Sequence, residues 1–425
     1  MSATRLTGPL LAALAVSTLA GCSSDEGAPA LCDRSIVGNI CTLAGNGENG
    51  YDGDDGPALA ALLSLPQDTL TASDGTIYVL DWNNHRIRRL TPDGKIEHVA
   101  GRGELGGTLD DPANGDFNHP TSMLFENDGE QYIVIAAWHN SKIRRLDLAT
   151  GQITDTCGDG RRAYFGDDGP ALTSTLDLPA SIAWDPAGNL VVMDQANQVL
   201  RSIDAEGTIH HLYGRCVIEP AGVGGCDEPT PCAAPSGKST CGDPMTTCAS
   251  ACTPGFNGDD VPAADMRIAQ PFGQSAYPAG RIAYDPEGNL YFADTGNAII
   301  RRIDGDGIAR RIAGLAPEGG RPQEGYSGDG GPATEAELNA PVDLALDSDG
   351  TLYFSDVYNN CVRKIDPDGI IDTVAGICGG RSGVLGDGVP AREAALRLPY
   401  GIELVGDELL ISDSGHNQIR SVRLR

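Results

Sequence analysis

Asp68, Arg281 and Asp343 are the charged side chains most able to form a site, because they occupy one shared position in different copies of a repeated segment. The remaining copies carry Ser122, Ser181 and Gly401 at this position. Two carboxylates and a guanidinium can bind a polar ligand or a cation, and they can equally pair with one another. The sequence leaves these two interpretations open.

Two tryptophans occupy another shared position of the repeat, in a chain that is only 5% aromatic. Trp82 and Trp138 each follow the end of an expected second strand. An indole in an exposed turn can stack on a sugar, a peptide or an aromatic ligand. The alternative is that each ring packs on a neighbouring loop. We take both residues, together with Asp68, Arg281 and Asp343, as the candidate ligand-binding set.

Aspartates recur at two further positions of the repeat. One set ends the expected second strands and comprises Asp81, Asp194, Asp294, Asp356 and Asp413. The other lies in Gly-Asp turns such as those at 54–56 and 328–330. Paired carboxylates beside glycines suit calcium, which binds hard oxygen ligands. A structural role explains their recurrence better, because a carboxylate can accept the N–H groups of the next turn. We expect structural turns, with calcium as the alternative cofactor.

All of these positions are defined by a segment of about 57 residues that occurs six times, a period typical of units that must stack on their neighbours. The landmark of each copy is a Gly-Asp turn followed by Pro-Ala, as at 328–333. Within a copy, short apolar runs alternate with Asp-Gly or Pro-Asp-Gly turns. Four short strands per repeat predict the blade of a β-propeller.

The predicted fold is therefore all-β: a six-bladed β-propeller over residues 36–425, with a Cys-rich insertion at 215–255 between blades 3 and 4. The last copy offers three strands, and the segment 40–45 resembles its missing fourth strand. We expect this N-terminal strand to complete the last blade and remove an open sheet edge. Chain length alone suggests two or three domains, but six blades make one closed domain.

The turn after the second strand carries a sequence signature. In the first copy it reads Asp-Trp-Asn-Asn-His-Arg-Ile-Arg at 81–88, and the segments 294–301 and 413–420 follow the same order. This order resembles the NHL repeat, in which Asp and two residues precede Asn-His and Ile-Arg. The second copy departs from it, with Ala137 in place of the Asp. The resemblance covers residues 36–425 except the insertion, and it implies a propeller used mostly for binding and in some members for catalysis.

The resemblance also implies enzymatic alternatives. Amidating lyases among related propellers hold a channel zinc with three histidines, but His119 has no histidine at the equivalent positions, and His85 and His139 belong to the repeat's turns. Lactonase-type propellers hold calcium at the channel mouth with Glu, Asn and Asp. Asp68 and Asp343 fit part of that set, but the early Glu is missing. We keep a metal-dependent lyase or lactonase-type hydrolase at the channel mouth as the alternative function, and we assign no catalytic residue.

The N-terminal segment has the features of an export signal. Residues 6–20 are apolar but form a segment too short to span a bilayer. The sequence Leu-Ala-Gly-Cys at 19–22 resembles a bacterial lipobox, in which Cys22 would be the lipidated residue. The alternative is an ordinary secretory signal with an incidental cysteine. We expect a signal peptide at 1–21, a lipidated tether at 22–35 and a location on the bacterial cell envelope, with Ser23 resembling outer-membrane sorting signals.

The other cysteines suit an oxidising compartment. Cys361 and Cys378 flank the outer hairpin of one blade, which predicts a disulfide, and we expect a second between Cys32 and Cys41. The insertion holds six cysteines whose pairing sequence cannot decide, namely Cys216, Cys226, Cys232, Cys241, Cys248 and Cys252. It lacks the paired CxxC motifs or added histidines of a zinc site. Cys157 remains as a free thiol.

Charge limits the class of partner. The formal net charge of −29 argues against nucleic acid and against an anionic membrane surface, so only the lipid should touch membrane. In a propeller, the turns between second and third strands gather at one face, where concave, loop-lined ligand sites form. We therefore expect a monomeric binding or scaffold propeller rather than an enzyme, presenting this face to a protein or glycan partner.

Overall fold

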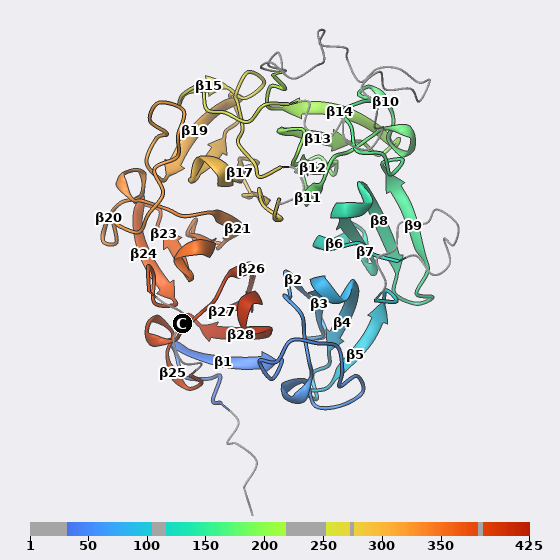
Figure 1. Cartoon of the computed structure of the whole chain (residues 1–425), viewed down its shortest axis with the longest axis vertical. Helices are drawn as coiled ribbons and strands as arrows, with labels where there is room; N and C mark the ends of the chain where they lie inside the picture. Colours follow the sequence, from blue (N-terminus) through green and yellow to red (C-terminus); the bar gives the residue numbers. More distant parts are fainter. Residues whose placement is uncertain (1–31, 104–115, 218–251, 273–275, 381–385) are drawn as a thin grey trace, which may run out of the picture. The chain divides into compact units, whose positions relative to one another are not determined.

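A computed structural model describes residues 32–103, 116–217, 252–272, 276–380 and 386–425. The chain divides into two compact units, Met1–Cys32 and Asp33–Arg425, and the described strands lie in the second. Figure 1 shows that unit as six antiparallel sheets set around a central axis. This arrangement confirms the predicted six-bladed propeller.

The first two blades are four-stranded sheets whose strands follow one another in chain order. Blade 1 contains β2 (Asp68–Thr71), β3 (Ile77–Asp81), β4 (Arg86–Leu90) and β5 (Ile96–Ala100). Blade 2 contains β6 (Pro120–Glu126), β7 (Gly129–Ala137), β8 (Lys142–Asp147) and β9 (Ile153–Cys157). In both blades the first strand lies nearest the axis and the fourth lies outermost (Figure 1).

Blades 3 and 4 add a two-residue strand outside the fourth strand. Blade 3 contains β11 (Pro179–Trp184), β12 (Leu190–Asp194), β13 (Val199–Ile203), β14 (Thr208–Tyr213) and the short β10 (Gly169–Pro170). Blade 4 contains β16 (Ile282–Tyr284), β17 (Leu290–Asp294), β18 (Ile299–Ile303), β19 (Ile308–Ala313) and the short β15 (Val261–Pro262). Each short strand lies directly after the aspartates of a Gly-Asp turn, a segment for which the sequence predicted only a turn.

Blades 5 and 6 have the same five-stranded arrangement. Blade 5 contains β21 (Pro341–Leu346), β22 (Leu352–Asp356), β23 (Cys361–Ile365), β24 (Ile370–Ala375) and β20 (Gly331–Pro332). Blade 6 contains β26 (Pro399–Val405), β27 (Glu408–Asp413), β28 (Gln418–Arg423), β1 (Asn39–Ala44) and β25 (Val389–Pro390). Strand β1 pairs antiparallel with β28, with Ile40 opposite Val422. The N-terminal strand thus forms the fourth strand of the last blade.

Short 3-10 helices connect the strands. Four of the Pro-Ala landmarks open one, giving η1 (Ala58–Ala60), η5 (Ala171–Thr173), η7 (Ala333–Glu335) and η9 (Ala391–Glu393). Turns between second and third strands hold η2 (Trp82–Asn84), η4 (Trp138–Asn140), η6 (Thr295–Asn297), η8 (Val357–Asn359) and η10 (Ser414–His416). Within the described part of the chain, no helix is long and apolar enough to cross a membrane.

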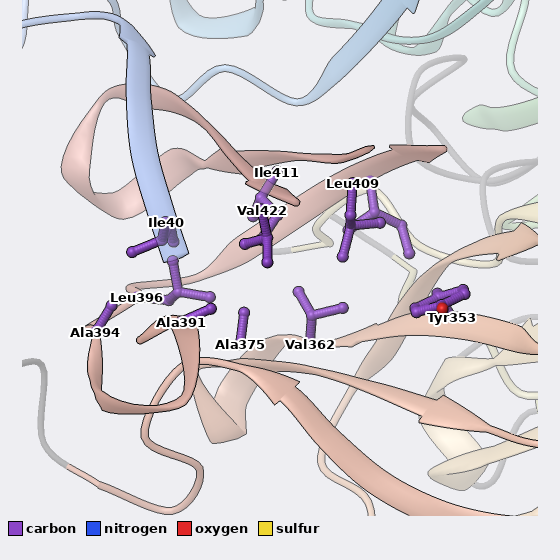
Figure 2. Close-up of a cluster of buried hydrophobic side chains, with 11 residues drawn as sticks. Ile40, Tyr353, Val362, Ala375, Ala391, Ala394, Leu396, Leu409, Ile411 and Val422 are labelled. Atoms are coloured by element: carbon purple, nitrogen blue, oxygen red, sulfur yellow. The ribbon is translucent and has the colours of Figure 1, made fainter. Parts of the chain in front are cut away.

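The core lies between neighbouring sheets. Figure 2 shows the layer between blades 5 and 6, where Leu409 and Ile411 of β27 point to the same face. They meet Val362 of β23 and Ala375 of β24, and Ile40 of the closing strand joins the cluster. Alternate residues of a strand point to the same face, so the alternating apolar pattern of each blade builds one such layer. Burying a side chain of this size contributes about 1.5–3 kcal/mol.

The described cysteines agree with the expected disulfides. Cys361 and Cys378 are bonded, with their Cα atoms 5.1 Å apart, and this confirms the predicted pair. Cys32 and Cys41 are both disulfide-bonded. Cys157 is a buried free thiol. In the insertion, the structure shows a bond joining its two ends, Cys216–Cys252. The other four insertion cysteines lie outside the described residues, as do the predicted signal peptide and most of the tether: Cys226, Cys232, Cys241, Cys248, 1–21 and 22–31.

Candidate functional site

We call the end of the propeller that carries η2, η4, η6, η8 and η10 the top face. The Asp that ends a second strand is buried just beneath it. In blade 3, Asp194 accepts hydrogen bonds from the N–H of Asp177 at 2.7 Å and from Asn197 Nδ2 at 2.9 Å. Arg201 Nη1 lies 3.4 Å from the same carboxylate. Burial raises the pKa of Asp194 to about 7, against the lowering effect of Arg201.

Equivalent contacts fix the aspartates of other blades, namely Asp81, Asp294 and Asp356. Burial raises the pKa of each of these three carboxyls to about 6. An arrangement that recurs from blade to blade stabilises the turn that it sits in, which is the structural role expected from the sequence.

The Gly-Asp turns belong to the same network. Asp167 lies 2.6 Å from Arg201, and Asp329 lies 2.7 Å from Arg363. Both arginines are completely buried, and Tyr326 also lies against Arg363, with 5.1 Å between the guanidinium carbon and the ring centroid. The two recurring aspartates of a repeat therefore meet at one arginine, although they are far apart in the sequence.

Blade 2 departs from this pattern at the top face. Ala137 replaces the Asp, and Asn140 Oδ1 accepts the N–H of Asn118 at 2.8 Å in its place. Arg144 occupies the arginine position but pairs with the partly exposed Asp155 at 3.0 Å. The turn of blade 2 thus keeps its backbone hydrogen bond without the buried ion pair of the other blades.

The residues of the ring position, around the channel, join each blade to the next. Asp68 Oδ2 accepts the N–H of Met123 at 3.0 Å, which links blades 1 and 2. Asp343 Oδ2 accepts the N–H of Ile402 at 2.8 Å, which links blades 5 and 6. A carboxylate at this position therefore joins two neighbouring sheets by a hydrogen bond, which occupies part of its capacity to bind a ligand.

The smaller ring residues follow the same rule. Ser122 and Ser181 accept the N–H groups of Ile182 and Ile282 in the next blade, at 3.4 and 3.1 Å. Gly401 closes the ring by close approach, because a Cβ there would lie 2.2 Å from the carbonyl oxygen of residue 67. Glycine is the only residue that leaves room for this contact.

Arg281 is the exception, since its side chain crosses the channel. It extends from blade 4 to blade 1, where Nη1 lies 3.0 Å from Asp68 Oδ2. Nη2 donates to the carbonyl oxygens of Gln67, at 3.3 Å, and of Thr121 in blade 2. Burial raises the pKa of Asp68 to about 7, against the lowering effect of Arg281, and it raises the pKa of Asp343 in the same way. The three predicted charged residues thus form one buried, electrostatically coupled group beside the channel.

The segment that precedes blade 4 covers this group. Ala276 packs on the cluster that contains Trp138, between blades 2 and 3. The next residue, Tyr277, packs on Val342 and Tyr400 of blades 5 and 6. Two consecutive residues thus contact opposite sides of the mouth, so this part of the segment lies across it.

The two predicted tryptophans differ in accessibility. Trp138 is 1% exposed, and its Nε1 donates to Gln195 Oε1 at 3.1 Å. Trp82 is half-buried, with its ring centroid 6.4 Å from that of Trp138. Trp138 therefore packs on its neighbours, which was the alternative stated for it, and Trp82 keeps part of its ring at the surface.

The fold gathers three histidines beside these tryptophans, a cluster that the repeat pattern does not predict. His119 Nδ1 lies 3.0 Å from His139 Nδ1, and His85 Nδ1 accepts the N–H of His119 at 3.2 Å. Burial lowers the pKa of His119 to about 3 and that of His139 to about 4, and it lowers the pKa of His85. The three histidines lie at different positions of the repeat, so aligning the copies does not place them in one equivalent set. Across the described residues, no three His, Cys, Asp or Glu side chains gather as a metal site.

Comparison with known proteins identifies similar chains. The sequence model of the family described as "Teneurin NHL domain" matches residues 39–228 and 320–384. Protein SUPPRESSOR OF QUENCHING 1, chloroplastic, of Arabidopsis thaliana is 24% identical over 77% of this chain and 27% of its own length. Teneurin-3 of Danio rerio is 26% identical over 90% of this chain and 13% of its own length. This chain therefore spans less than a third of the curated relatives that it matches.

A solved structure has a similar fold. The structure described as an auxiliary nutrient binding protein from Bacteroides ovatus aligns with a TM-score of 0.56 and 14% identity. The alignment covers 90% of this chain and 76% of that one. At this identity the likeness concerns the fold alone.

Proposed function

The chain belongs to the teneurin NHL domain family, and on that premise we propose that it is a binding propeller whose top face receives a protein or glycan partner. The observation that carries the proposal is the mouth itself, where Ala276 and Tyr277 pack on opposite sides and Arg281 is buried against Asp68. A mouth crossed by such a segment offers a partner an extended surface rather than a cavity that encloses a small substrate. The similar structure described as a nutrient binding protein supports the same class.

The contact surface lies around this mouth and is aromatic. Tyr358 of η8 is 45% exposed and Phe272 is 44% exposed, while Trp82 and Tyr277 are half-buried. Aromatic side chains supply much of the binding energy at interfaces, because they bury large areas at low entropic cost. The other predicted ligand-binding residues are buried, and we assign them to supporting this surface: Trp138, Asp68, Arg281 and Asp343.

The channel-mouth enzyme finds less support in this geometry. Both oxygens of Asp343 accept backbone N–H groups, from Leu344 at 2.9 Å and Ile402 at 2.8 Å. Both oxygens of Asp68 are likewise engaged, by Thr69 and by Met123 with Arg281. Calcium at this place would have to share oxygens that already accept these hydrogen bonds.

We expect the double variant Trp82→Ala/Tyr358→Ala to bind its partner at least about 30-fold more weakly than the wild type, the effect of removing interface hot spots. The partner would first be sought on glycan arrays and by cross-linking to bacterial envelope proteins, and affinity would then be measured by calorimetry. Leu172→Ala is the matched control, since Leu172 is 55% exposed in η5 at the outer edge of blade 3. Unchanged affinity in the double variant, with loss in the control, would move the site away from the top face.

We also propose that the propeller is anchored at the bacterial cell envelope through a lipid on Cys22, after removal of residues 1–21. The lipobox-like sequence before Cys22 supports this proposal. The disulfides Cys361–Cys378 and Cys216–Cys252 suit an oxidising compartment outside the cytoplasm. The propeller would then begin at residue 36, with 22–35 as its tether.

Anchoring predicts that Cys22→Ser abolishes incorporation of labelled fatty acid and releases the protein from the membrane fraction. A lipid chain is what holds an otherwise membrane-free domain at a bilayer, so its loss should be complete rather than partial. Cys157→Ser, at a buried free thiol, should leave labelling unchanged. Continued labelling of the Cys22 variant would contradict the proposal.

A further inference from the structure

Two histidines and an amide oxygen on blade 2 are arranged as metal ligands. His119 Nδ1 lies 3.0 Å from His139 Nδ1 and 2.8 Å from Asn118 Oδ1. Ligands bound to a metal at roughly 2.0–2.1 Å lie about 2.8–3.4 Å from one another at the angles of tetrahedral, square or octahedral sites. His119 Nδ1 therefore already has the spacing of a neighbouring ligand to each of the other two donors. We propose that Asn118, His119 and His139 bind one late first-row divalent metal ion, such as Zn²⁺ or Cu²⁺.

The backbone holds the ligand segment from both sides. The N–H of Asn118 donates to Asn140 Oδ1 at 2.8 Å, and the N–H of His119 donates to His85 Nδ1 at 3.2 Å. His119 itself has a φ of 54°, in the left-handed region, directly before Pro120. Constraints of this kind preorganise a site, because little freedom remains to be lost when the ion binds.

The aromatic neighbours fix the two rings. The ring of Trp138 stacks on His139 with centroids 4.2 Å apart and 19° between planes. Trp82 lies against His119, with centroids 4.3 Å apart. His139 is exposed while Asn118 and His119 are half-buried, so solvent can reach the ligands and water can complete the coordination.

The metal class follows from the donors. Imidazole nitrogen suits zinc, copper and nickel, whereas calcium and magnesium prefer sites made wholly of oxygen. With two imidazoles and one amide, the order of affinity should place Cu²⁺ above Zn²⁺. The site also lies where Ala137 replaces the buried aspartate of the repeat, so blade 2 lacks the buried aspartate–arginine pair of other blades.

The inference is independent of the proposed function, and its test needs only the purified protein. Tag-free protein, stripped of metal by chelator, would be titrated with Zn²⁺ and with Cu²⁺ by calorimetry. We expect one equivalent to bind, His139→Ala to weaken binding at least about 30-fold, and His119→Ala/His139→Ala to abolish it, since second-shell changes alone cost 10–100-fold. Ca²⁺ should not compete.

Two further readouts separate a metal site from a simple hydrogen bond between the rings. Bound Cu²⁺ should show nitrogen hyperfine splitting in its electron paramagnetic resonance spectrum, and it should quench the fluorescence of Trp82 and Trp138. His98→Ala, in β5 of blade 1, is the control and should bind as the wild type does. Absence of stoichiometric binding by the wild type would overturn the proposal, as would full binding by a double variant that melts like the wild type.

Discussion

Replacing Arg281 with leucine should destabilise the folded chain by about 3–5 kcal/mol, because it leaves buried carboxylates without their cation. The guanidinium lies 3.0 Å from Asp68 and also stabilises Asp343 across the channel. The free energy of unfolding would be measured by urea titration followed by tryptophan fluorescence. Arg89→Leu is the control, since its ion pair with Glu97 is partly exposed, at 44% and 28%, and should contribute no more than about 1 kcal/mol.

This effect should also depend on pH. In the wild type, burial raises the pKa of Asp68 to about 7, above its ordinary value of 3.8. The folded state therefore binds a proton more tightly than the unfolded state, and this contribution to stability is fully present below pH 4 and is lost as pH rises through 7. Without Arg281 the pKa of Asp68 rises further, so the loss in Arg281→Leu should be larger at pH 8 than at pH 5.5. Equal losses at both pH values would show that Asp68 does not depend on this cation.

Arg201→Met should destabilise the chain by about 3–5 kcal/mol, whereas Arg144→Met should cost about 1 kcal/mol. Arg201 and Asp194 are completely buried and 3.4 Å apart, and Arg201 also pairs with Asp167 at 2.6 Å. Methionine keeps much of the volume of the side chain but leaves Asp194 as an unpaired buried charge.

Arg144 occupies the same position in blade 2 and is therefore the matched control. Its partner Asp155 is about one-third exposed at 32%, and Ala137 stands in place of the buried aspartate. Both variants would be compared by urea unfolding at pH 8, above the pKa of about 7 that Asp194 has in the wild type. If the two substitutions cost the same, the aspartate of the repeat does not depend on its arginine.

The fold follows from local patterns in the chain. Alternating apolar residues such as Leu409 and Ile411 specify strands, and Asp-Gly turns set their lengths, so six similar copies predict six blades. The family match confirms the resemblance to NHL repeats that the turns at 81–88 and 413–420 indicated. The bond between Cys361 and Cys378 was also predictable, because a hairpin brings the two ends of adjacent strands together.

The candidate site depends on contacts between copies, which no single repeat encodes. The sequence aligned Asp68, Arg281 and Asp343 correctly at one position, but only the closed ring places Arg281 of blade 4 against Asp68 of blade 1. In that ring the possible ligand-binding residues pair with one another, because a buried guanidinium is stable only beside carboxylates.

The histidine cluster shows the same limit more clearly. His85, His119 and His139 come from three different positions of the repeat, and they meet because neighbouring blades bring unlike turns together. Sequence periodicity determines which residues are equivalent, and hence the strands, the blades and their number. Which non-equivalent residues touch is decided by how the blades pack, since that packing brings together side chains from different positions of different copies.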